Sequence, residues 1–520
     1  MSDRQRRRIA ASPGKVTPMS QQTLMVDNPP NQLKRGRLGA TAIAFMVISA
    51  AAPLTAMAGG APVAMLLGNG PGVPLAYVVV TILLALFAVG YTTMARFHTS
   101  TGGFYSYVAR GLRPHAGGAA AWIALLGYNV MQIGLYGLFG VAASSAIAEL
   151  TGITVPWWVC AYAALAIIAV LGFRQVDLSV KVLGIIVALE FLLVLVLDFA
   201  IIGQGGGGGG VPLNFDSFTM ASFTSGSLAI ALLFNSASYI GFEATTIYSE
   251  EAKDPGRTVP RATYIAVFTI GAFYTFTSWL MVNAQGSETL VSHLAEMDDP
   301  TGFLFELGAV YVGDVMTAAM SVLFATSVFA ALLAFHNAVA RYLFALGREG
   351  VVPEALGRTH RVHLSPHMGS LSQTVLAILV MTLFVVTGQD PVLAQFTWLT
   401  QLGTLAILFL MAFASVAVVA FFARHRELGV SAIRGRIAPA IAAVLVVVTA
   451  VFATSQFGNL IGDPNSPLAW ALPSLILVAA VVGGVSAEVL RRRDPAAFEE
   501  MGRDRGQEAD VEEADVSEPV

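Results

Sequence analysis

Twelve apolar runs, each long enough to cross a lipid bilayer, dominate the chain between residues 39 and 490. A helix needs about 20 mostly apolar residues to cross about 30 Å of hydrocarbon. The runs cover 39–67, 72–94, 117–149, 155–172, 178–203, 222–249, 262–285, 305–345, 371–387, 392–423, 437–456 and 469–490. Only 12% of the residues are charged, against about a quarter in soluble proteins. The sequence therefore predicts an all-α integral membrane protein with 12 transmembrane helices.

The distribution of lysine and arginine predicts the orientation of these helices. With the N-terminal tail inside, all 29 Lys and Arg residues fall in the tails or in the even-numbered connections. The opposite loops, such as 286–305 and 456–468, contain none. Cytoplasmic loops of membrane proteins are enriched in basic residues. We therefore expect a multi-pass protein of the cell membrane, plasma or inner, with both termini in the cytoplasm.

Three regions follow from this pattern. Residues 1–37 are expected to form a cytoplasmic tail, and residues 38–490 the twelve-span domain. Residues 491–520 form an acidic tail that is too polar to bury a core, so disorder is predicted there. The glycine run 205–210 is expected to be a flexible outer linker.

Several classes of partner find no support in the sequence. The net charge of −4 gives no indication of a nucleic-acid partner. A single cysteine, Cys160, excludes an internal disulfide and a cysteine-only metal site. The histidines His360, His363 and His367 have helical spacing, but Pro366 disfavours a helix there. No metal site and no cofactor are therefore expected.

Two apolar runs contain interruptions. The first run has Pro53 near its middle, which removes a backbone donor and clashes with the preceding turn. The sixth run is interrupted by the small and polar segment 235–243, which ends on a carboxylate. For either run alone, a kink or close packing of small residues explains the pattern equally well. Interruptions at corresponding places in two halves, however, indicate a transporter's binding site.

Corresponding places exist if the first ten runs form two five-helix halves. The predicted inverted repeats cover 38–203 and 222–423, and the last two runs, 437–490, follow them. Free N–H groups at the start of a half-helix suit an anion, and free carbonyls at a helix end suit an ammonium group. A zwitterionic amino acid presents both ions one carbon apart. Two facing interrupted helices would therefore bind it well.

Specific motifs resemble a known family. Residues 241–243 and 250–262 closely resemble the span-six signature of the amino acid–polyamine–organocation (APC) superfamily. Residues 102–107 resemble its glycine-aromatic motif after span two, and residues 337–353 resemble its loop after span eight. The resemblance covers residues 36–490 and implies the LeuT-like five-plus-five inverted-repeat fold with discontinuous helices 1 and 6. It also implies transport of amino acids or related amines.

The chain departs from that family in two places. The first span usually has a glycine-rich break, whereas this chain has Ala52-Pro53-Leu54-Thr55, and Pro53 has no N–H to donate. Some proton-coupled members carry a lysine deep in span five, and here Glu190 lies at about that depth. A lysine-based coupling mechanism is therefore not transferred to this chain.

The candidate site residues fall into three groups. The substrate-binding candidates are Ser49, Ala51, Ala52, Pro53, Leu54 and Thr55 in the first run and Ser238, Tyr239, Ile240, Gly241 and Phe242 in the sixth. The coupling or gating candidates are Glu190 and Glu243, because a charge inside a membrane is costly and usually functional. The candidates for lining a cavity are Asn129, Gln132, Ser327 and Trp398, with Thr400 and Gln401 beside the last.

Each group also has a structural interpretation. Glu243 could cap backbone donors of the half-helix, and Glu190 could make a buried structural hydrogen bond. Helix–helix hydrogen bonding explains the polar residues equally well. Asp198 lies nearer the outer end of its run, where we expect water to reach it.

The leading functional prediction is a secondary active transporter, or permease, that moves amino acids across the cell membrane by alternating access. Proton symport and substrate exchange both remain open, with protons and membrane lipid as candidate partners. The alternatives are a carrier of polyamines or other organic amines with the same fold, and an amino acid-binding membrane sensor. An enzyme is disfavoured because no catalytic motif is found, and an ATP-driven pump because no phosphate-binding loop is found.

Overall fold

The computed structural model describes residues 38–97, 103–174, 180–206, 212–249, 252–360 and 365–502. These residues are helical apart from connections and one isolated bridge between Leu38 and Ala252. The predicted N-terminal tail, most of the glycine run, part of the histidine loop and the end of the acidic tail lie outside the described residues.

Nine helical elements are described in the first part of the chain. They are α1 (Ala40–Ala51), η1 (Thr55–Gly60), α2 (Ala61–Leu67), η2 (Gly70–Gly72), α3 (Val73–Met94), α4 (Gly103–Gly111), α5 (Pro114–Thr151), α6 (Trp157–Phe173) and α7 (Val180–Gly203). The middle part contains η4 (Asp216–Phe218), α8 (Met220–Phe223), α9 (Leu228–Ala237), η5 (Phe242–Ser249), α10 (Pro255–Gln285), α11 (Leu290–Glu296), η6 (Pro300–Gly302), α12 (Phe303–Tyr311) and α13 (Asp314–Arg348). The last part contains η7 (Glu354–Gly357), α14 (His367–Val386), η8 (Pro391–Phe396), α15 (Thr397–Arg424), η9 (Arg426–Leu428), η10 (Ile433–Ile437), α16 (Ala438–Ser455), α17 (Phe457–Ile461), α18 (Leu468–Arg493) and α19 (Pro495–Glu499).

Ten helical segments of the described residues are long and apolar enough to cross a membrane. They are Ala40–Leu67, Gly70–Met94, Pro114–Thr151, Val182–Gly203, Gly256–Gln285, Asp314–Arg348, His367–Val386, Pro391–Arg424, Ile433–Ser455 and Leu468–Arg493. Two shorter apolar helices, α6 and α9, occupy the predicted fourth and sixth runs. The predicted all-α architecture is thereby confirmed for the described residues, and their long apolar helices fit a multi-pass membrane protein. The count of twelve crossings stays a prediction.

Two boundaries differ from the sequence prediction. The eighth run, 305–345, is divided into α12 and α13 at Gly313, whose φ of +116° is a conformation that glycine adopts readily. At the other end, α18 continues to Arg493 and α19 follows at Pro495–Glu499. The first residues of the predicted acidic tail are therefore helical.

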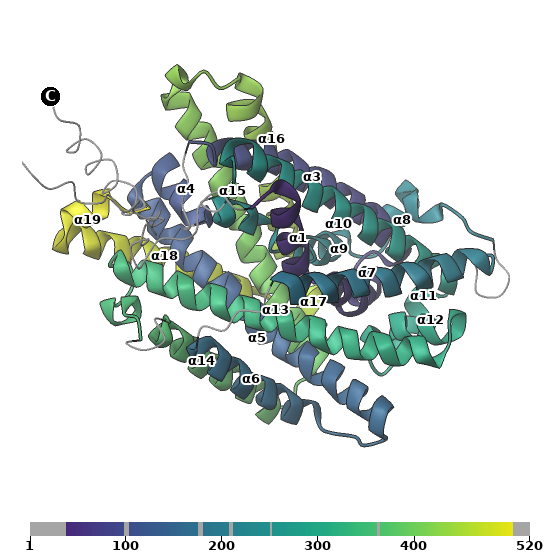
Figure 1. Cartoon of the computed structure of the whole chain (residues 1–520). Helices are drawn as coiled ribbons and strands as arrows, with labels where there is room; N and C mark the ends of the chain where they lie inside the picture. The colour runs from purple at the N-terminus through teal and green to yellow at the C-terminus, as the bar shows by residue number, and fades with distance from the viewer. Residues whose placement is uncertain are drawn as a thin grey trace, which may run out of the picture. The chain divides into compact units, whose positions relative to one another are not determined.

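The long helix α5 is the centre of the packing. It contacts α13, α15, α18, α4 and α6, and α13 runs along it in Figure 1. On one side of α5, α6 packs beside α14. The helices α14, α16 and α18 expose apolar side chains such as Leu379, Val448 and Leu477. An apolar outer surface of this kind suits contact with lipid rather than water.

The contact between α5 and α18 depends on two facing glycines. A Cβ atom at Gly483 would overlap the carbonyl oxygen of Gly118, whereas a Cβ at the neighbouring Gly484 meets nothing within 4 Å. Small residues allow close approach of membrane helices. We expect Gly483→Val to destabilise the protein by about 1–3 kcal/mol through overpacking, and Gly484→Val to have little effect. Thermal unfolding in detergent measures both, and equal losses would contradict close backbone contact at Gly483.

Candidate functional site

The first membrane segment is interrupted at a single residue. The helix α1 ends at Ala51, and Ala52 adopts a left-handed conformation with φ +46° and ψ 74°. It is the one non-glycine residue with positive φ in the described part of the chain. Pro53 follows and has no N–H to continue the helical hydrogen bonds. The chain then resumes as η1, so the predicted break near Pro53 is present.

The second interruption lies between α9 and η5. The chain turns at residues 238–241, where Gly241 has a φ of +114°. A Cβ atom placed on Gly241 would lie 3.2 Å from the Cβ of Ala50, the penultimate residue of α1. The structure therefore brings the two interruptions into contact, although they are distant in sequence.

Each interruption is capped by a carboxylate. The backbone N–H of Leu54 donates to Oε2 of Glu190 over 3.1 Å, and the backbone N–H of Gly241 donates to Oε2 of Glu243 over 2.8 Å. Both donors lie at a break, and both glutamates are buried. The main-chain N–H groups at these two positions are therefore occupied by side chains, and the Glu243 contact fits the structural interpretation that it caps a backbone donor.

Glu190 connects three membrane segments. It lies on α7, accepts from Leu54 after the first break, and is hydrogen-bonded by the hydroxyl of Ser327 on α13. The Ser327 hydroxyl also lies 3.0 Å from the hydroxyl of Thr55, the first residue of η1. Because a carboxylate only accepts, Ser327 donates to Glu190 and accepts from Thr55. A change in the Glu190 side chain would therefore affect the first interruption in two ways, directly through Leu54 and indirectly through Ser327 and Thr55.

Glu243 is held by tyrosines. The hydroxyl of Tyr128 on α5 donates to Oε1 of Glu243 over 2.9 Å. The hydroxyl of Tyr91 on α3 lies 3.1 Å from the Glu243 carbonyl oxygen and 2.7 Å from the Thr246 hydroxyl. The ring of Tyr91 packs against Tyr107 of α4, with centroids 5.2 Å apart. The glycine-aromatic motif is thereby joined to the second interruption.

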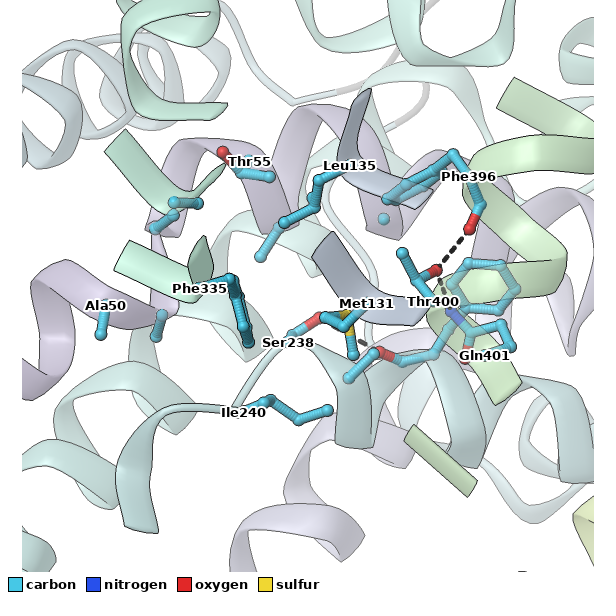
Figure 2. Close-up of a pocket in the computed structure, with 17 residues that line it drawn as sticks. Ala50, Thr55, Met131, Leu135, Ser238, Ile240, Phe335, Phe396, Thr400 and Gln401 are labelled. Carbon is cyan, nitrogen blue, oxygen red and sulfur yellow. Dashed lines mark hydrogen bonds between the residues drawn. The ribbon is translucent and has the colours of Figure 1, made fainter. Parts of the chain in front are cut away.

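A cavity of about 70 Å³ lies between the two interruptions (Figure 2). A site of this size has room for several water molecules. Its lining consists of Ala50, Ala51, Ala52, Thr55, Ala56, Gly60, Met131, Leu135, Phe234, Ala237, Ser238, Ile240, Ala331, Phe335, Phe396, Thr400 and Gln401. All of these residues are described, and none of them carries a charge.

Some of the predicted substrate-binding residues line this cavity. They are Ala51, Ala52, Thr55, Ser238 and Ile240, and the lining also includes Thr400 and Gln401 of α15. Pro53, Leu54 and Gly241 form the interruptions themselves but do not line the cavity.

Three other predicted substrate-binding residues point elsewhere. The hydroxyl of Ser49 donates to the carbonyl of Phe45 within α1. The hydroxyl of Tyr239 lies 2.6 Å from the hydroxyl of Thr81. The ring of Phe242 packs edge-on against the ring of Phe87.

The four cavity candidates on α5, α13 and α15 do not line the cavity. Asn129 donates to the carbonyl of Leu125 one turn earlier. Gln132 lies in a buried polar cluster, where its amide nitrogen is 3.2 Å from Nδ1 of His336. Ser327 bonds Glu190 and Thr55 as described, and the ring of Trp398 packs against Phe384. These contacts fit the structural interpretation of helix–helix hydrogen bonding.

The apolar wall of the cavity was not predicted from the sequence. Met131 and Leu135 of α5, Phe335 of α13 and Phe396 of η8 all line it. An apolar residue that faces a cavity has the same sequence pattern as one that faces the core. Only its position beside the interruptions, which requires the three-dimensional structure, distinguishes it.

Asp198 is placed differently from the expectation. Its side chain on α7 is fully buried, and its Oδ2 accepts a hydrogen bond of 2.8 Å from the Thr277 hydroxyl of α10. The expectation that water reaches Asp198 is therefore wrong. Packing against α10 covers it, which its distance from the end of the run did not indicate. No cluster of metal ligands occurs among the described residues.

A model of the amino acid permease family matches residues 38–483. The chain belongs to the amino acid permease family. The match covers both interruptions, both capping glutamates and the cavity lining. Membership groups this permease with multi-pass membrane transporters and not with enzymes.

Curated relatives of the permease transport different substrates. It is 24% identical over 319 residues to a low-affinity putrescine importer of Escherichia coli (strain K12), which covers 59% of the chain and 66% of the importer. It is 23% identical over 376 residues to a branched-chain amino acid permease of Bacillus subtilis (strain 168), covering 69% and 75%. It is 25% identical over 323 residues to a histidine permease of Lactococcus lactis subsp. cremoris (strain MG1363), covering 60% and 65%. These names span amines and amino acids, so the choice of substrate depends on the site.

Proposed function

We propose that this permease is a secondary transporter that carries amino acids across the cell membrane by alternating access. The two interrupted segments that meet at an uncharged cavity carry this proposal. Interrupted helices at a repeat interface are how many transporters bind substrates near the bilayer midplane. The main-chain dipoles there can bind an ammonium and a carboxylate without charged side chains.

The proposed topology has twelve crossings with both termini in the cytoplasm. The ten long segments supply most of them, and α6 and α9 supply the fourth and sixth. The helix α9 is short because the second interruption ends it, and η5 continues after the turn. With this count, every Lys and Arg residue lies on the cytoplasmic side. The first ten crossings form the proposed five-plus-five inverted repeat.

We propose that the substrate binds between the ends of α1 and α9. Both helices end at the cavity, at Ala50–Ala52 and at Ala237 respectively. The C-terminal carbonyls of a helix carry partial negative charge, so they would hold the substrate's ammonium group. The substrate's carboxylate would take the N–H groups of Leu54 and Gly241, which adjoin the lining residues Thr55 and Ile240 and would become accessible when the capping side chains release them.

The capping glutamates would then compete with the substrate for the same donors. Glu190 holds the Leu54 N–H, and Glu243 holds the Gly241 N–H. A protonated carboxyl group is a weaker acceptor than a carboxylate. Protonation would therefore release the backbone donor and favour binding of the substrate's carboxylate. This competition would couple uptake of a proton to uptake of an amino acid.

An amine such as putrescine is the second candidate because one relative is named for it. A diamine carries two positive charges and no carboxylate, and a buried charge needs an opposite partner. Among the described lining residues there is no Asp or Glu. The uncharged lining favours a zwitterion, whose ammonium group is bound by the carbonyl ends of α1 and α9 and whose carboxylate is bound by the N–H groups after the interruptions.

The test is transport by purified protein in liposomes. Labelled neutral amino acids and labelled putrescine would each be offered with and without an inward proton gradient, and with unlabelled substrate inside. The proposal expects uptake of an amino acid that the gradient or internal substrate stimulates. Uptake of putrescine alone would support the amine carrier, and the absence of any transport would contradict both.

A further inference from the structure

Two polar side chains of α15, Thr400 and Gln401, form one wall of the cavity (Figure 2). They lie near the start of α15, which directly follows the π-helical segment η8. Both side chains are buried, with exposed fractions of 2% and 0%. They therefore contact protein and cavity rather than bulk water, and their hydrogen-bonding groups must be satisfied inside the site.

The hydrogen bonds of Thr400 determine the orientation of the Gln401 amide. The Thr400 hydroxyl donates to the carbonyl oxygen of Phe396 over 2.7 Å, one turn earlier. A hydroxyl has one proton, so towards Gln401 it can only accept. The Gln401 amide nitrogen, 3.4 Å from the Thr400 hydroxyl oxygen, is therefore the donor. The nitrogen and oxygen of a side-chain amide are assigned from their hydrogen bonds. Because the nitrogen of Gln401 faces the Thr400 hydroxyl, its Oε1 points away from that hydroxyl.

Oε1 of Gln401 has no hydrogen-bond partner. The other hydroxyls that line the cavity are engaged: Thr55 with Ser327, and Ser238 with the carbonyl of Phe234. Among the described lining residues, Gln401 thus presents the one buried side-chain acceptor without a partner. A buried acceptor left unpaired is unfavourable, so a donor in the cavity would be stabilised there.

We propose that Gln401 is a specificity-determining residue that selects amino acids whose side chain carries a neutral hydrogen-bond donor, a hydroxyl or a carboxamide. The donor bonds Oε1 of Gln401 while the carbonyl ends of α1 and α9 hold the substrate's ammonium group. This inference rests on the proposed function and names the substrate class of that site.

The neutral class follows from the chemistry of the lining. A cationic side chain could also donate to Oε1, but its charge would lie among Met131, Leu135 and Phe396 without a carboxylate. An apolar side chain would leave Oε1 unpaired, which is unfavourable for a buried acceptor. Both classes are therefore disfavoured relative to a hydroxyl or carboxamide.

Threonine and valine provide the sharpest comparison, because they have the same shape and differ only by hydroxyl against methyl. We expect threonine to compete for uptake of the labelled substrate about tenfold better than valine, the effect of one good hydrogen bond in a buried site. In Gln401→Met, which keeps a similar volume and removes the amide, we expect this preference to disappear. Competition curves in liposomes measure both ratios.

Gln395 offers a matched control on the preceding turn. It is equally buried, its amide donates to the carbonyl of Ile133, and its Oε1 also lacks a partner, but it does not line the cavity. Gln395→Met should therefore keep the threonine preference even if it lowers stability.

The outcomes separate this inference from the proposed function. Equal competition by threonine and valine in the unaltered protein, which needs no variant to fold, would overturn the inference while leaving amino acid transport intact. An unchanged ratio in a folded Gln401→Met variant, or stronger competition by putrescine than by threonine, would also overturn it. Failure to transport any amino acid would instead overturn the proposed function.

Discussion

Glu190→Gln should abolish gradient-driven accumulation of substrate while leaving exchange close to that of the unaltered protein. Glutamine keeps an acceptor for the Leu54 N–H and keeps a partner for Ser327, so the cap on the first interruption survives. It loses only the ability to bind and release a proton. A gradient of one pH unit stores about 1.4 kcal/mol per proton, which supports about tenfold accumulation. The variant should therefore bring substrate only to equal concentrations on the two sides.

The measurement is uptake of labelled substrate into liposomes, with an inward proton gradient in one arm and internal unlabelled substrate in the other. Glu354→Gln is a suitable control, because Glu354 lies exposed in η7, away from the cavity. It should retain both activities. If Glu190→Gln loses exchange as fully as it loses accumulation, Glu190 has a structural role and the coupling proposal fails.

Gly241→Leu should remove substrate binding without preventing folding. A leucine at φ +114° is strained by about 1–3 kcal/mol, and its Cβ would lie 3.2 Å from the Cβ of Ala50. The rest of its side chain would extend between the two interruptions, where we place the substrate. We expect affinity to fall by more than tenfold, measured as the loss of the substrate-dependent rise in melting temperature.

A leucine substitution at Gly313 is the control that distinguishes backbone strain from a direct effect on the substrate site. Its φ of +116° almost equals that of Gly241, but a Cβ there meets nothing within 4 Å. Gly313→Leu should lower stability through strain and leave affinity unchanged. Wild-type affinity in Gly241→Leu would exclude the second interruption from the site, and a similar loss of affinity in Gly313→Leu would attribute the effect to strain alone.

The membrane character of the fold and both interruptions could be predicted from the sequence because they are local. A run of apolar residues, a proline in its middle and a small-residue segment each act on their own stretch of backbone. The first interruption is nevertheless tighter than expected, with one left-handed residue, Ala52, before Pro53. The position of a break that a residue's own chemistry imposes, as at Pro53, can be predicted from the sequence.

The partners of the interruptions could not be predicted, because they depend on helices distant in sequence. Glu190 is 136 residues from Leu54, and only the packing of α7 beside α1 brings them together. The same applies to the burial of Asp198 by α10 and to the apolar wall supplied by Met131 and Phe335. Polarity alone favoured Asn129 and Trp398 as lining residues, yet both are engaged in contacts outside the cavity.

We propose that a small zwitterion binds between the ends of α1 and α9. A high-resolution structure of the protein with bound L-threonine tests it most directly. We predict density between Ala51 and Ile240, with the ammonium against the α1 carbonyls and the side-chain hydroxyl at Oε1 of Gln401. Ligand density elsewhere, or α1 and α9 continuing as unbroken helices through residues 52 and 241, would contradict the account.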